Sequence, residues 1–180
     1  MIGSAAMRIQ LGRVDGLAGY HDVHTHPDAQ RLPGLVIYRF DGPLFFANAT
    51  TFRDEIRRLA KAEPKPAWIV IAAEPVTDVD TTASDMLTDL DEALNAQGIS
   101  LVFAELKGPV RRKIERYGLT RTIDPDHFFP TIGAAIAAFR DDTGAQWAAA
   151  DGQPADGQAA PGQVAADGGP SPDIPAVPPQ

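Results

Sequence analysis

Residues 78–84 read Asp-Val-Asp-Thr-Thr-Ala-Ser and carry the side chains of this chain best suited to chemistry. They join an apolar run at residues 67–73 to an amphipathic pattern at residues 82–97. A helix that starts here leaves backbone N–H groups unpaired, and the positive end of its dipole lies beside Thr81, Thr82 and Ser84. Such a helix start can hold a phosphate, either on a bound nucleotide or attached to a threonine.

Plain helix capping is the competing interpretation of the same residues. Asp80 or Thr81 would then accept N–H bonds from the first turn, which includes Ala83. Carboxylates near the helix start would also repel an anion or a phosphate on Thr82. They belong to Asp78, Asp80 and Asp85. On the residues alone, capping ranks ahead of phosphate binding.

A histidine-rich stretch at residues 21–26 offers metal-ligating groups. Asp22 to His26 has the Asp-x-His-Thr-His spacing that opens metal-dependent amidohydrolases, which take further ligands from later barrel strands. Here only His127 follows, and 180 residues are few for a barrel of about 250. The chain also has no phosphate-loop glycine motif and no Ser-His-Asp order with supporting context. We expect no metal site, no catalytic residues and no enzyme activity.

Two further patterns suggest docking. A basic segment follows residue 106, and it is either the solvated face of a helix or a patch for a partner, lipid headgroups or nucleotide phosphates. Its cations are Lys107, Arg111, Arg112, Lys113, Arg116 and Arg121. Phe45 and Phe46, just before Asn48, would point to opposite faces of a short strand. One ring would then reach the core and the other would form an interface, unless the N-terminal segment covers both rings.

Composition bounds the class of protein. The chain has no cysteine, so it has no disulfides and no thiolate metal site. It also has no apolar run long enough to cross a bilayer, and we expect it to be soluble. Residues 141–180 hold six aspartates and no Lys, Arg or Glu, which leaves a net charge of only −2 for the rest. Without a broad basic surface, nucleic acid is excluded as a partner. The Ala, Gly, Pro and Asp composition of residues 141–180 predicts a disordered tail.

The expected fold is α/β, because apolar strands alternate with helical patterns between residues 33 and 140. Strands at residues 35–40 and 44–46 would form a hairpin, and Asn48 would cap the first helix. Later strands are expected at residues 68–73, 99–104 and 128–129. Helices are expected from residue 82 to Gly98, around residues 110–117, and after Thr131.

The pattern resembles a STAS domain, the sulfate-transporter and anti-sigma-factor-antagonist fold. It is most similar to the cytoplasmic C-terminal STAS domain of a bacterial, actinobacterial or mycobacterial SulP-family anion permease. The residues that carry the resemblance are 11–14, 20–23, 33–40, 43–48, 79–83 and 108–111. Within them, Leu-Gly-Arg-Val at residue 11 and Phe-Phe-Ala-Asn at residue 45 are typical of the transporter branch.

The resemblance implies a mostly parallel sheet of four or five strands with about four helices. It divides the chain into a linker at residues 1–32 that follows a membrane domain, the STAS domain at 33–140, and a tail at 141–180. Thr82 matches the serine that is phosphorylated in soluble anti-sigma antagonists, and Asp80 matches their acidic residue. Ala83 replaces their glycine and Phe45 an acidic residue, and both departures favour the transporter branch.

The expected function is therefore a non-catalytic regulatory and interaction domain of a sulfate or anion transporter, on the cytoplasmic face of the plasma membrane. The implied partners are the transmembrane domain of the same transporter and a second copy of the domain. The loop at residues 78–84 would bind a guanine nucleotide, GDP or GTP, without turnover, and no cofactor is required. The alternative is a freestanding anti-sigma-antagonist-like protein, switched by phosphorylation at Thr82.

Overall fold

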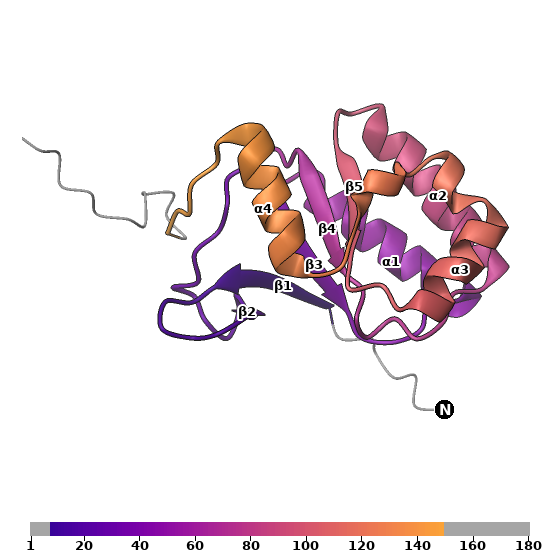
Figure 1. Cartoon of the computed structure of the whole chain (residues 1–180), viewed down its shortest axis with the longest axis horizontal. Coiled ribbons are helices and arrows are strands. Elements are labelled where there is room, and N and C mark those ends of the chain that lie inside the picture. Colours follow the sequence, from indigo (N-terminus) through magenta and orange to yellow (C-terminus); the bar gives the residue numbers. More distant parts are fainter. Residues whose placement is uncertain (1–7, 150–180) are drawn as a thin grey trace, which may run out of the picture.

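The computed structural model describes residues 8–149, which form one six-stranded sheet covered by helices on both faces (Figure 1). The strands are β1 (Arg8–Arg13), β2 (Tyr20–Asp22), β3 (Leu35–Phe40), β4 (Trp68–Ala72), β5 (Ser100–Ala104) and β6 (Phe128–Phe129). The α-helices are α1 (Phe46–Leu59), α2 (Thr81–Asn95), α3 (Gly108–Tyr117) and α4 (Ile132–Thr143). Two 3-10 turns, Leu119–Arg121 and Pro125–His127, connect α3 to β6.

The strand order is β2-β1-β3-β4-β5-β6, and β3 to β6 are parallel. Repeated strand–helix crossovers predict such parallel pairing, and the α/β fold is confirmed. The predicted hairpin between residues 35–40 and 44–46 is wrong. The antiparallel partner of β3 is β1, and Leu44 makes only a single parallel bridge to Val79 before α1 begins.

Side chains alternate strictly between two apolar cores, as the two-residue period of strands requires. Ile69 and Ile71 of β4 face the core beneath α1, α2 and α3, whereas Val70 and Ala72 face α4. Figure 1 shows α4 alone across one face and the other three helices across the opposite face. Both faces of the central strands are therefore buried, which explains their continuous apolar runs.

The sheet begins earlier than the predicted domain boundary at residue 33. Residues 8–22 supply β1 and β2, so the segment expected to be a linker forms one edge of the sheet. Because this edge of the sheet is only partly buried, polar residues are tolerated there, and the sequence shows no continuous apolar run that would indicate a strand. Gly12 allows close packing here, since a Cβ at this position would lie 2.9 Å from both Ala29 Cβ and the Gln30 carbonyl oxygen.

The fold also continues past the predicted boundary at residue 140. Helix α4 runs to Thr143, and Trp147 and Ala148 beyond it are buried. Ala148 and Arg31 exchange backbone hydrogen bonds of 2.8 and 2.9 Å. The tail predicted for residues 141–180 thus begins too early, and residues 150–180 lie outside the described part of the chain. Within residues 8–149, no helix is both long and apolar enough to span a membrane.

Candidate functional site

The loop at residues 78–84 follows β4 and meets the start of α1, 34 residues away in sequence. Leu44 donates its N–H to the Asp78 carbonyl at 2.9 Å, and its own carbonyl accepts the Asp80 N–H at 3.2 Å. This pair of bonds fixes the entrances of α1 and α2 side by side. The two helices therefore begin at one shared junction.

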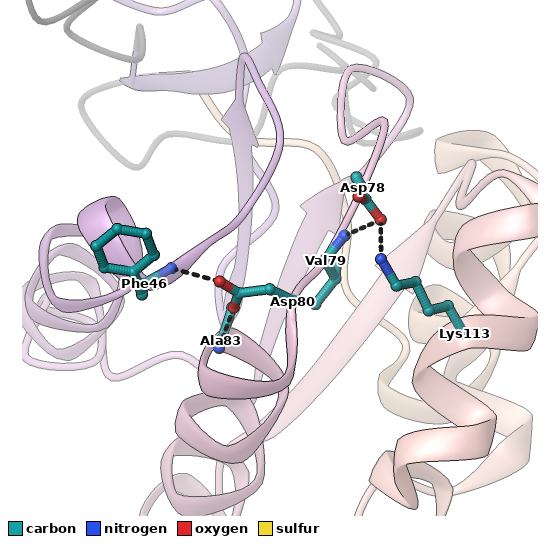
Figure 2. Close-up of polar contacts among 6 residues, drawn as sticks. All are labelled: Phe46, Asp78, Val79, Asp80, Ala83 and Lys113. Carbon is teal, nitrogen blue, oxygen red and sulfur yellow. Dashed lines mark hydrogen bonds and ion pairs between the residues drawn. The ribbon is translucent and has the colours of Figure 1, made fainter.

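Asp80 caps both helices at that junction (Figure 2). Its Oδ1 accepts the N–H of Ala83 in the first turn of α2 at 2.7 Å, and its Oδ2 accepts the N–H of Phe46 at the start of α1 at 2.9 Å. A carboxylate placed here also faces the positive ends of two helix dipoles. The prediction that Asp80 or Thr81 caps α2 is confirmed for Asp80, whereas its bond to α1 was not predicted.

The start of α1 corrects the prediction that Asn48 caps this helix. Phe45 occupies the N-cap position and Asn48 the third helical position, so Asn48 is not the N-cap. Its amide still supports the turn, because Oδ1 accepts the Phe45 N–H and Nδ2 donates to the Pro43 carbonyl, both at 2.9 Å. Phe45 has no side-chain acceptor for the first turn, and Asp80 supplies one instead.

Asp78 is bound to α3 through Lys113, whose Nζ lies 2.6 Å from Asp78 Oδ1 (Figure 2). The same oxygen accepts the N–H of Val79 at 2.9 Å. The hydrogen bond from Lys113, followed by that from Val79, holds the pKa of Asp78 below its ordinary value. In the sequence, Lys113 belongs to the basic segment that follows residue 106. Nothing local in the sequence indicates its pairing with Asp78.

The four residues that open α2 separate into two exposed and two buried positions. Thr81 and Thr82 are exposed, as a phosphate-accepting or ligand-binding role would require. Ala83 and Ser84 are buried at 0% and 1% exposure, so Ser84 cannot present its hydroxyl to a ligand. They begin the inward face that continues through Leu87 of α2. The part of the predicted site that solvent reaches is therefore narrower than residues 78–84.

Both rings at the start of α1 are exposed, against the prediction that one would reach the core. Phe46 is 70% exposed and Phe45 37% exposed, and their centroids lie 5.9 Å apart in an edge-to-face arrangement. The prediction assumed a strand, in which adjacent side chains alternate, but this turn of helix directs both outward. Leu17 is the only other large apolar side chain classed as exposed within residues 8–149.

The basic segment is partly neutralised within the fold. Lys107 Nζ lies 3.6 Å from a Glu74 carboxylate oxygen, and Arg111 binds Glu115 at 2.9 Å. The Arg111 guanidinium also stacks over the Phe128 ring, 5.2 Å from its centroid. Arg112 is exposed, with no ion pair to a carboxylate among the described residues. The interface predicted for these cations stays a prediction, with less free charge than the sequence suggests.

Three other titratable residues lie away from the junction. His21 and His26 pack edge to face at 5.3 Å, and no set of three or more potential metal ligands gathers within residues 8–149. Asp91 of α2 is only 1% exposed and accepts a hydrogen bond from Asn95 at 3.0 Å. Burial raises the pKa of Asp91 above its ordinary value.

Comparisons with known proteins assign this architecture to a family. The model of the STAS domain family matches residues 26–135. A probable sulfate transporter of Mycobacterium tuberculosis is 41% identical over 131 residues, which cover 72% of this chain and 23% of that protein. Sulfate transporter 1.3 of Arabidopsis thaliana is 30% identical over 135 residues, covering 70% and 21%. The chain thus spans about a quarter of the length of these relatives.

Solved structures share the fold. The murine anion transporter Slc26a9 matches with a TM-score of 0.68 at 22% identity, over 76% of this chain and 22% of that one. The STAS domain of a SulP transporter from Vibrio cholerae matches with a TM-score of 0.53 at 22% identity, over 67% and 92%. With the family model covering more than half of its length, this chain belongs to the STAS domain family.

Proposed function

We propose that this chain is the STAS domain of a sulfate transporter and serves it as a non-catalytic docking and regulatory module. The observation that carries the proposal is the exposed aromatic pair Phe45 and Phe46 at the junction of α1 and α2. Large exposed apolar groups are characteristic of interaction sites. The relatives named as sulfate transporters are about four times longer than the matched segment, so further transporter sequence is the natural partner.

The docking surface is held in place by the bonds beneath it. Asp80 anchors the Phe46 backbone to the start of α2, and Lys113 ties the adjacent Asp78 to α3. A partner that contacts the two rings therefore meets a surface whose backbone is fixed before binding, which lowers the entropy cost of association. We place this contact at the cytoplasmic face of the membrane, with the transmembrane domain of the same transporter as partner. A second copy of the domain is the other candidate.

A matched pair of substitutions in the full-length transporter tests the proposal. Phe46→Ala should lower sulfate uptake and abolish cross-linking from a photoreactive residue at position 45, without reducing the amount of transporter in the membrane. Leu17→Ala removes a comparably exposed side chain, 48% exposed, outside the junction and should leave both unchanged. Equal uptake and cross-linking in the two variants would contradict docking through the aromatic pair.

Control of this junction by a phosphate is the finer part of the proposal. Thr82 is exposed at the second position of α2, where either a kinase or a guanine nucleotide could reach it. The Asp80 carboxylate, however, already accepts the Ala83 N–H and repels a further anion. Asp80→Asn should therefore strengthen any binding of GDP, GTP or ATP, seen as larger chemical-shift changes at residues 78–84. No clustered shifts in either protein at millimolar nucleotide would remove nucleotide binding from the proposal.

The freestanding anti-sigma-antagonist-like protein remains the second candidate, favoured by the same exposure of Thr82. It predicts stoichiometric phosphorylation at Thr82 by a cognate kinase and loss of partner binding on phosphorylation. Mass spectrometry of the chain isolated from its own cells, compared with a Thr82→Ala control, separates the two candidates. An adjacent reading frame for many membrane spans would favour the transporter.

A further inference from the structure

A groove of about 320 Å³ lies at the end of the sheet remote from the junction of α1 and α2. It is bounded by the start of β3, the turn after α1, and the segment that follows α4. Most of its walls are apolar, including Leu32, Pro33, Ala62, Pro64, Pro66 and Ala148. The aromatic pair takes no part in it, so a ligand of this groove is independent of the proposed function.

The chain itself passes along this groove and leaves the described fold there. Arg31 and Ala148 exchange two backbone hydrogen bonds, and the next residue, Ala149, lines the groove. Another 31 residues follow it in the sequence. Any segment among them is tethered at the rim of the groove, so its local concentration is of the order of millimolar without a second molecule.

One segment of these 31 residues has the composition that an apolar groove selects. Residues 174–179 read Ile-Pro-Ala-Val-Pro-Pro, without charge. Beyond residue 149, the branched apolar side chains are those of Val164, Ile174 and Val177, and two of the three lie here. Prolines restrict the backbone before binding, which lowers the entropy cost of ordering the segment in an apolar groove. The 24 residues before Ile174, treated as a flexible linker, span about 25–30 Å, enough to return to the groove.

Charge favours the same encounter. Residues 150–180 carry four aspartates and no cation, and Asp173 directly precedes the apolar segment. Around the groove, Arg31 is an exposed lining residue and Lys61 is exposed beside the lining residues of the turn after α1. Lys65 in the same turn donates to the Gln97 carbonyl at 2.6 Å. Among residues 8–149 no carboxylate pairs with Arg31, and the opposing charge in that turn is Glu63. The aspartates that precede the apolar segment are therefore attracted to the net positive charge at the rim of the groove.

We propose that residues 174–179 bind in this groove within the same molecule. The segment would contact Leu32, Pro33 and Pro64, with Asp173 facing Arg31. Binding covers an apolar surface beside Ala149 that would otherwise be in contact with water. Because the attraction is partly electrostatic, it weakens as salt is raised, whereas the apolar contact persists.

The absence of cysteine from the whole chain makes a clean experiment available. A nitroxide attached to the full chain through Ala176→Cys should selectively broaden the amide signals of Gly34, Ala62 and Lys65, compared with the reduced label. The matched control carries the same label at Gly162→Cys, which lies among the 31 residues after Ala149 but outside the apolar segment at residues 174–179. We expect a several-fold lower intensity ratio at these amides for position 176 than for position 162.

Two further samples decide the interpretation. Ile174→Asp combined with Val177→Asp, in the labelled position-176 chain, should restore the groove signals while leaving the rest of the spectrum unchanged. Equal broadening from both label positions, or broadening that survives the double substitution, would overturn the proposal. A mixture of isotope-labelled wild-type chain with nitroxide-carrying chain that has no isotope label tests binding between molecules. If the groove amides of the wild-type chain broaden in this mixture as much as they do within one molecule, the segment binds a second copy and the proposal fails.

Discussion

Replacing Asp80 tests whether one carboxylate stabilises the starts of two helices. Loss of an ordinary N-cap side chain costs about 1 kcal/mol of the free energy of unfolding. Asp80→Ala removes in addition the hydrogen bond to the Phe46 N–H at 2.9 Å, and a bond to a charged acceptor contributes about 1.5–3 kcal/mol. Since water reaches this junction and can replace part of that bond, we expect a total loss of about 2–3 kcal/mol.

The matched control is Thr131→Ala in α4. Thr131 caps a single helix, accepting the Ala134 N–H at 3.0 Å, so its loss should cost about 1 kcal/mol. Urea unfolding followed by circular dichroism gives both values under the same conditions, with an unchanged m-value confirming a change in stability alone. A loss for Asp80→Ala no larger than that for Thr131→Ala would refute the double cap. Asp80→Asn keeps one acceptor oxygen and should fall between the two.

Three further substitutions test the buried and paired groups. Burial raises the pKa of Asp91, so the stability it supplies is present below the unfolded pKa of about 3.9 and lost as pH rises through the folded value. Asp91→Asn should therefore gain stability relative to wild type between pH 4 and pH 8 in urea titrations. Lys113 lowers the pKa of Asp78, so that contribution is present above about pH 3.9 and lost as pH falls through the folded value. Asp78→Asn should therefore lower the melting temperature slightly at pH 7; the difference should shrink as pH falls below about 3.9, and high salt should also reduce it. Gly12→Ala should cost about 1–3 kcal/mol in the same urea assay, because the added Cβ would overlap Ala29 and the Gln30 carbonyl oxygen. A neutral effect would contradict tight packing around β1.

The elements that sequence predicts well are those with strong local signals. Continuous apolar runs indicate β4 and β5 because both faces of these strands are buried, and Gly118 ends α3 at a φ of 88°, as a left-handed C-cap requires. Strands β1 and β2 lack such a signal, because water reaches part of their surface and polar residues are tolerated. In the sheet β1 pairs with β3 and β2 pairs with β1, and sequence spacing reveals neither pairing.

The contacts of the candidate site also separate into local ones, which the sequence predicts, and long-range ones, which it does not. That Asp80 caps α2 follows from its position before a helical pattern, since the bond to Ala83 spans three residues. Its bond to Phe46 spans 34 residues and that of Asp78 to Lys113 spans 35, so neither has a local signature. The error over Phe45 and Phe46 has the same origin. A short aromatic run predicts a strand until a distant acceptor becomes available to start a helix there.

If Phe46 docks the partner as proposed above, the shared cap links that docking energetically to any modification of Thr82. A negative charge on Thr82 repels the Asp80 carboxylate, weakens its bond to the Phe46 N–H, and so loosens the turn that presents the rings. Reciprocity then requires docking at Phe46 to disfavour that charge to the same extent. We expect Thr82→Glu to reduce photo-cross-linking from position 45 in the full-length transporter, and to have no further effect in an Asp80→Ala background. An equal reduction in both backgrounds would show that the two positions communicate by another route, and Asp80 would then be a structural cap alone.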